Sequence, residues 1–237
     1  MGNAISHTSF REIAEYIDVI RNEDSVNTLF QRLESRGNVV IVGGTIRDIL
    51  FNKKKPRDID IILDTEDDVL DDVFVGMKYS RNRFGGYKAI HNKQIFDIWT
   101  IRSNWAFKNN IVDTKVENIP KGCFYNLDAA YFNLATGEGE ATYFKSALNN
   151  KRLDIILDEQ YIDCNPSPEI NIIRAMVLKK QYELSYSSRV KKYISNWLCT
   201  IENPVIELKS AELKHYKTND KIDEKEIDEL MLELAVE

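Results

Sequence analysis

Two short segments of the sequence combine residue types that could act on a phosphate group. The first is Gly43-Gly44, which follows the β-branched run at 39–42 and precedes Thr45 and Arg47. Glycines at a strand-to-helix turn let an anion approach the backbone N–H groups, and an arginine one turn later could bind phosphate oxygens. A Gly-Gly pair after a strand is also common as a plain tight turn, so this segment alone does not define a site.

The second segment holds Asp58 and Asp60, at the start of a strand expected over 58–63. Carboxylates at positions i and i+2 of a strand point to the same face, about 7 Å apart. Such like charges are usually solvent-exposed or share a cation, and Mg²⁺ takes carboxylate oxygens together with substrate phosphates. Asp97 is a lone acid in the apolar, aromatic run 95–101. It is either a surface acid of an edge strand or the third ligand of a two-metal site.

Composition restricts the class of protein. The 237 residues are 43% apolar and 30% charged, which is typical of a soluble globular protein. The formal net charge of −6 means that binding to nucleic acid would need a local basic patch. Three cysteines and three histidines, widely spaced, favour neither a disulfide framework nor a zinc or histidine-rich centre. No apolar run is long enough for a membrane span, so a cytoplasmic protein without membrane contact is expected.

Hydrophobic periodicity predicts an α+β protein in three parts. Helices over 1–36 should pack on an α/β head at 37–160, and a helical neck-like region should follow at 161–237. Within the head, we expect hairpins pairing 87–91 with 95–101 and 129–133 with 140–144. The acidic stretch 64–73 is expected to form an amphipathic helix with a solvated face.

Residues 39–50, followed by 57–63, resemble the head domain of the bacterial poly(A) polymerase and CCA-adding tRNA nucleotidyltransferase family. That family's motif is a Gly-Gly-x-x-Arg-Asp turn and then Asp-x-Asp. Looser similarities lie at 83–86 and 96–102, which resemble the hairpin that follows in the family and carries the family's third acidic residue. Others lie at 133–138, an Asn-Pro-Leu-Thr-Gly-Glu-like segment, and at 172–175, the start of the neck helix. The resemblance covers about 37–185.

The resemblance implies a nucleotidyltransferase-type mixed sheet of about five strands with flanking helices, followed by a small all-helical C-terminal region. Asp58, Asp60 and Asp97 would be the catalytic residues and would hold two Mg²⁺ ions, with Mn²⁺ as an alternative. The nucleotide-binding residues would be Gly43, Gly44, Thr45, Arg47 and Arg174.

Two departures from the family pattern concern the nucleotide contacts. The family's Arg-Arg-Asp falls on Gly122-Cys123-Phe124. Its base-reading Glu-Asp-x-x-Arg falls on 167–171, and of this motif only the later Arg174 matches. Contacts to the sugar and the base are therefore missing or supplied elsewhere. Because the helical part ends early, we do not expect CCA addition to tRNA.

A basic cluster adjoins the expected site and could contact a nucleic-acid backbone; its members are Lys53, Lys54, Lys55 and Arg57. Basic and aromatic residues also mix over 79–88, as they do in proteins that bind single strands, although ordinary hairpin packing would give the same pattern.

The function expected is a Mg²⁺-dependent, template-independent nucleotidyltransferase. It would transfer NMP or dNMP from a nucleoside triphosphate to a hydroxyl, such as a nucleic-acid 3′ end, and release pyrophosphate. One alternative is nucleotidylation of a protein side chain, its own included, or of a small molecule, in a toxin or antiviral-defence setting. Another is a catalytically weak, nucleotide-binding regulatory subunit. A protein partner or a homo-oligomer stays open.

Overall fold

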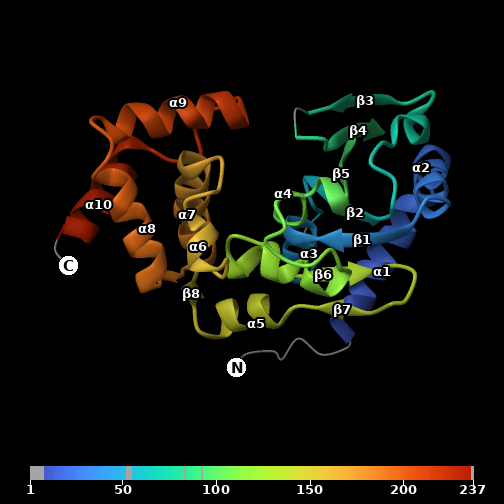
Figure 1. Ribbon diagram of the computed structural model, residues 1–237, viewed down its shortest axis with the longest axis horizontal. Helices are drawn as coiled ribbons and strands as arrows, with labels where there is room; N and C mark the ends of the chain where they lie inside the picture. The colour runs from blue at the N-terminus through green and yellow to red at the C-terminus, as the bar shows by residue number, and fades with distance from the viewer. Residues whose placement is uncertain (1–7, 52–54, 83, 92, 236–237) are drawn as a thin grey trace. The chain divides into compact units, whose positions relative to one another are not determined.

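The computed structural model describes residues 8–51, 55–82, 84–91 and 93–235. The chain packs as two compact units, Met1–Lys145 and Ser146–Glu237. Figure 1 shows the first unit built around a sheet and the second built from helices. The division falls after Lys145, whereas the sequence placed the end of the head near residue 160.

A seven-stranded mixed sheet organises the first unit, with the strand order β3-β4-β5-β2-β1-β6-β7. The strands are β1 (Asn38–Val42), β2 (Asp58–Asp64), β3 (Lys78–Arg81), β4 (Tyr87–His91), β5 (Gln94–Thr100), β6 (Tyr131–Asn133) and β7 (Gly139–Glu140). Strands β2 and β5 pair in parallel, and the other neighbours pair antiparallel. The expected mixed sheet with flanking helices is confirmed, with more strands than the five or so expected.

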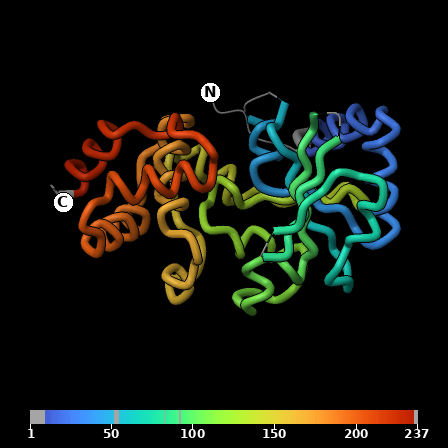
Figure 2. The backbone as a smooth tube through the Cα atoms, turned by 90° about the horizontal axis from the view of Figure 1, so that it is seen from above, coloured from blue at the N-terminus to red at the C-terminus, as the bar shows by residue number. Residues whose placement is uncertain are grey.

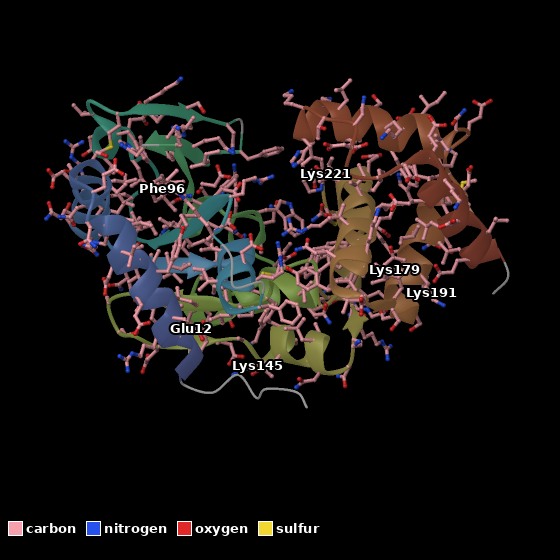
Figure 3. All side chains as sticks on the ribbon, turned by 180° about the vertical axis from the view of Figure 1, so that it is seen from behind. Glu12, Phe96, Lys145, Lys179, Lys191 and Lys221 are labelled. Carbon is pink, nitrogen blue, oxygen red and sulfur yellow. The ribbon has the colours of Figure 1, made fainter. Side chains whose placement is uncertain are left out.

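Helices cover one face of this sheet. Helices α1 (Thr8–Arg21) and α2 (Asp24–Glu34) lie side by side (Figure 2), and α3 (Gly43–Leu50) follows β1 directly. Phe30 of α2 packs edge-to-face on Phe96, with ring centroids 6.1 Å apart. Figure 3 labels Phe96 among the strands of the sheet. Since Phe96 points to the helices, its neighbour Asp97 points to the other face.

The opposite face is covered only in part. Val40 and Ile62 form a buried cluster there with Phe107 and Ile119, which come from the segment after β5. This segment contains α4 (Trp105–Lys108) and the 3₁₀ turns η2 (Ile101–Ser103), η3 (Val116–Asn118) and η4 (Pro120–Gly122). Because Ile62 lies on the same face as Asp58 and Asp60, the two acids lie beside this cluster.

The expected helix over 64–73 is wrong. The structure forms only a 3₁₀ turn there, η1 (Asp71–Phe74). A helix would place Asp67 beside Asp71 and Asp68 beside Asp72, and like charges at i and i+4 are destabilising. Arg36 instead forms ion pairs with Asp67 and Asp72, which hold the segment as a loop.

The second unit is mainly helical, as the periodicity from residue 168 indicated. Its elements are α6 (Glu159–Ile162), α7 (Pro168–Tyr182), α8 (Ser188–Leu198), α9 (Pro204–Tyr216), α10 (Glu224–Ala235) and the short parallel strands β8 (Arg152–Leu153) and β9 (Ser185–Tyr186). Helix α5 (Thr142–Asn149) spans the division between the units. Figure 3 marks Lys179 and Lys191 on helices of this unit.

Residues 150–158 join the second unit through backbone pairing. Strand β8 pairs with β9, and Arg189 of α8 donates a hydrogen bond to the carbonyl oxygen of Leu157 at 2.6 Å. The second unit therefore begins before the first long helix. Within the described ranges, no helix has both the length and the apolar character needed to cross a bilayer.

Candidate active site

Three carboxylates lie on one face of the paired strands β2 and β5. Asp60 is directly opposite Asp97 in the parallel register, and Asp58 is two pairs away, opposite Ile95. The side chains of Asp58 and Asp97 are 15% and 25% exposed. The strand alternation predicted from the sequence thus brings all three acids to the same surface.

The glycine turn lies against Asp60. Strand β1 ends at Val42, α3 begins at Gly43, and Gly43 has a φ of +57°, a conformation that L side chains rarely adopt. A Cβ added to Gly44 would lie 3.1 Å from the Asp60 Oδ2 atom. The absence of side chains here allows a carboxylate and the N-terminus of α3 to approach each other.

Thr45 holds this turn on the strand that carries the acids. Its side chain is fully buried; the hydroxyl accepts a hydrogen bond from the Asp60 N–H at 2.7 Å and donates one to the Asp58 carbonyl oxygen at 3.3 Å. The structure thus places Thr45 as a support for the two acids. Direct contact of Thr45 with a nucleotide stays a prediction.

Two cations neutralise two of the acids. Arg57 Nη2 lies 2.6 Å from Asp58 Oδ2, and Lys88 Nζ lies 3.1 Å from Asp97 Oδ1. Burial raises the pKa of Asp97 above its ordinary value, and Lys88 partly offsets this. The hydrogen bond to Asp58 raises the pKa of Arg57. Sequence reasoning did not assign Lys88 to the site.

Arg47, expected to bind phosphate, forms an ion pair with Asp128 at the end of η5 (Asn126–Asp128). Their side chains are only 13% and 12% exposed. A Cβ on Gly44 would lie 3.3 Å from Arg47 Nη2, so the guanidinium lies against the glycine turn. Asp128 is a second member of the site that the sequence analysis missed, because it lies far along the chain from Arg47.

The remaining predicted residues are less closely tied to this surface. Lys55 is exposed beside β2, while Lys53 and Lys54 fall outside the described residues. Arg174 lies half-buried on α7 in the second unit, and its role in nucleotide binding stays a prediction.

The donor chemistry of the site suits a hard divalent cation. In the described part of the chain, no group of three or more His, Cys, Asp or Glu side chains is close enough to hold a metal ion. Arg57 and Lys88, however, are 70% and 48% exposed, so both can move off the carboxylates they contact. Asp58, Asp60 and Asp97 would then present only oxygen ligands, which fit Mg²⁺ or Mn²⁺.

Comparison with known proteins agrees with the fold described above. Residues 39–128 match the family model described as Poly A polymerase head domain. A CCA-adding enzyme in apo form I is 17% identical, with 93% of this chain and 53% of that chain covered and a TM-score of 0.62. A Thermotoga maritima CCA-adding enzyme complexed with tRNA is 14% identical, with coverages of 94% and 54% and a TM-score of 0.61.

A tRNA nucleotidyltransferase complexed with a primer tRNA and an incoming ATP analog is 19% identical, with coverages of 84% and 58% and a TM-score of 0.59. This chain spans little more than half the length of these structures. Comparison with curated proteins gave no match. The resemblance expected from the sequence is thereby confirmed: residues 39–128 match the model of a poly(A) polymerase head domain, and the fold of the chain is similar to that of the CCA-adding enzymes.

Proposed function

We propose that this protein is a template-independent nucleotidyltransferase that transfers NMP or dNMP from a nucleoside triphosphate to the 3′ hydroxyl of a nucleic acid. One observation carries the proposal. Asp58, Asp60 and Asp97 share one face of β2 and β5, and Asp60 adjoins the Gly43-Gly44 turn at the N-terminus of α3. A site that only bound phosphate would have little need of three carboxylates.

In the proposed reaction, the acceptor hydroxyl oxygen forms a bond to the α-phosphorus, and the bond from that phosphorus to the β-phosphate oxygen breaks. Pyrophosphate leaves, and the hydroxyl proton passes to solvent or a carboxylate. The N–H groups at the start of α3 and the guanidinium of Arg47 would hold phosphate oxygens.

Asp58, Asp60 and Asp97 would hold the Mg²⁺ or Mn²⁺ ions. Such ions supply neutralisation of the charge that develops on the attacking and leaving oxygens. The protein's own contribution is to fix the acids: Thr45 anchors the backbone of two of them, and β5 pairing places the third. Arg57 and Lys88, once off the carboxylates, would be free to contact the polyphosphate.

The test is incorporation from each labelled NTP and dNTP, with Mg²⁺ and with short RNA, DNA or tRNA as acceptor. Products are analysed on gels and by intact protein mass. The Asp58→Ala/Asp60→Ala protein should incorporate nothing while keeping the wild-type circular dichroism spectrum. Asp64→Asn is the matched control, since Asp64 ends the same strand on the same face and bonds Asn38 instead, at 3.4 Å. Equal incorporation by the double variant would overturn the proposal.

A second candidate, a nucleotide-binding regulatory subunit, is favoured by one observation. The guanidinium expected to hold phosphate is already paired with Asp128, and both side chains are largely buried. This candidate predicts nucleotide-dependent stabilisation without pyrophosphate release. A gain of nucleotide mass on the protein itself would instead identify a protein hydroxyl as the acceptor.

A further inference from the structure

A polar cavity of about 610 Å³ lies in the first unit, where the turn between β3 and β4 meets the segment that follows β5. We call it the turn pocket. The lining residues used below are Arg81, Asn82, Phe84, Arg102, Ser103 and Lys108. None of the three acids of the candidate active site lines it.

The turn pocket carries more positive than negative charge. Among the described lining residues, three are cationic, namely Arg81, Arg102 and Lys108, and one is acidic, Asp68. Arg102 forms an ion pair with Glu66, whose side chain is 87% exposed, and such exposed pairs are weak and exchange readily. The ammonium group of Lys108 makes no ion pair among the described residues. A polyanion would therefore find exchangeable positive charge here although the whole chain carries −6.

The pocket also presents a partly exposed aromatic ring. Phe84 is 44% exposed. The turn that carries it is held by the Asn82 side chain, whose Oδ1 accepts hydrogen bonds from the Phe84 N–H at 2.9 Å and the Gly86 N–H at 3.1 Å. Gly85 has a φ of +97°, which allows this tight turn, and its missing Cβ leaves room for Ser103. With these hydrogen bonds placing the backbone of Phe84 at the pocket, its exposed ring offers a surface for stacking.

The turn pocket is connected to the candidate active site through Trp99. The indole lies across Gly86, since a Cβ there would be 2.5 Å from the ring. Trp99 and Asp97 are two residues apart on β5 and therefore share a face, about 7 Å apart. Lys88, paired with Asp97, lies on the same face of the neighbouring strand. Aromatic and basic groups thus extend from the turn pocket to the acids.

We propose that the turn pocket binds a single-stranded nucleic acid, with a base stacked on Phe84 and the neighbouring phosphates beside Arg102 and Lys108. An exposed aromatic ring beside several cations favours this ligand over an acidic peptide, because a base can stack on Phe84 while its phosphates meet the cations. That the bound nucleic acid is the acceptor of the transferred nucleotide rests on the proposed function. That the turn pocket binds nucleic acid does not depend on it.

The test is fluorescence anisotropy of the full-length protein with a labelled single-stranded RNA, without nucleotide or divalent metal, at several salt concentrations. Phe84→Ala should weaken binding about tenfold, because one stacking contact is lost. Arg102→Gln and Lys108→Gln should each weaken binding several-fold and lower the salt dependence by about one phosphate contact. Tyr143→Ala and Lys115→Gln are matched controls, since Tyr143 is 39% exposed on α5 and Lys115 is exposed outside the pocket.

An oligonucleotide with abasic sites separates stacking from charge. It should bind wild type about tenfold more weakly than the intact strand, and Phe84→Ala should no longer distinguish the two. A single-stranded DNA of the same sequence shows whether the sugar is read. The proposal is overturned if the pocket variants bind like wild type, if they lose no more than the controls, or if no strand binds at low salt.

These outcomes can be distinguished from failure of the proposed function. Asp58→Ala/Asp60→Ala should bind the RNA at least as tightly as wild type, because two negative charges are removed, while transferring nothing. If the wild-type protein transfers no nucleotide but binds RNA through the turn pocket, the binding proposal stands and the proposed transferase function is rejected. If transfer requires the acids but RNA binding does not change in Phe84→Ala, the proposed function stands and the binding proposal is rejected.

Discussion

Two sets of acidic side chains, one in each unit, have opposite surroundings. In the first, Asp58 and Asp97 lie on a partly open sheet face, and each pairs with an exposed cation. In the second, Glu212 is fully buried, and its carboxylate accepts hydrogen bonds from the Lys209 ammonium at 2.7 Å and from the Lys221 N–H at 2.5 Å. The first arrangement can exchange its partners for a ligand, whereas the second is fixed by the fold. Asp58 and Asp97 therefore have the surroundings expected of a site, and Glu212 has those of a structural residue.

The comparison is tested most strongly by Glu212→Ala. The change leaves the ammonium group of Lys209, which is 22% exposed, without its carboxylate. We expect a loss of about 3–5 kcal/mol in the free energy of unfolding. Urea denaturation followed by tryptophan fluorescence measures this loss. Glu229→Ala is the control. It breaks the ion pair with Lys225, in which the Glu229 side chain is 63% exposed, and should change the free energy of unfolding by less than about 0.5 kcal/mol. Equal effects of the two changes would reject the structural role.

Thr45→Val tests whether the open acids depend on a buried support. Valine has a similar shape but removes the hydroxyl that bridges the backbone of Asp58 and Asp60. We expect a loss of about 1–3 kcal/mol in stability and weaker Mn²⁺ binding, measured by electron paramagnetic resonance. Thr45→Ser keeps the hydroxyl and should retain most of both. If the valine and serine variants behave alike, the hydroxyl is not the support.

Tyr193→Phe tests how burial fixes an ionisable group in the second unit. Burial raises the pKa of Tyr193 to about 12, and the side chain is 8% exposed. An unfolded tyrosine titrates near pH 10, so between the two values the folded chain binds more protons and its stability falls as pH rises. The variant should avoid about 1–2 kcal/mol of this loss between pH 10 and 12.

Thermal unfolding at several pH values measures this effect. Tyr161→Phe, on the half-buried Tyr161 of α6, is the control and should follow wild type. A Tyr193→Phe protein that loses stability in alkali as wild type does would contradict the assignment.

Lys88→Met tests the exchangeable pair, and its expected effect is the smallest. Removing the ammonium at 3.1 Å from Asp97 removes a competitor for a divalent cation. Because half-exposed pairs are weak, Mn²⁺ affinity should rise about two- to fivefold. Lys78→Met is the control and should leave the Mn²⁺ affinity unchanged. Lys78 lies on β3, on the same face of the sheet as Lys88, but it pairs with Ile90 instead of lying beside an acid. Weaker Mn²⁺ binding by the Lys88 variant would show that the lysine supports the site instead of competing for it.

Local patterns were enough to predict the central strands and their acids. Alternation along β2 places Asp58 and Asp60 on one face in any sheet. The lone Asp97 in an apolar strand indicated a third acid on a neighbouring strand. The parallel register that sets Asp60 opposite Asp97 confirms that these strands pair.

The partners of the acids could not be predicted in the same way. The sequence favoured a three-residue loop at 92–94, but Gln94 pairs with His91, and this register puts Lys88 opposite Asp97. One more loop residue would have shifted the pairing and turned Lys88 away from Asp97. Asp128 reaches Arg47 from a distant turn, which depends on tertiary packing and leaves no local pattern.

Pyrophosphate release by Asp60→Asn, compared with Asp64→Asn and wild type, tests the central claim most directly. Asp60 lies between the glycine turn and Asp97, so loss of its charge should affect both the nucleotide side and the metal side of the site. We predict a fall of about a thousandfold in rate for Asp60→Asn and a wild-type rate for Asp64→Asn, with both variants folded. Equal pyrophosphate release by all three proteins would contradict the assignment of this sheet face as the active site.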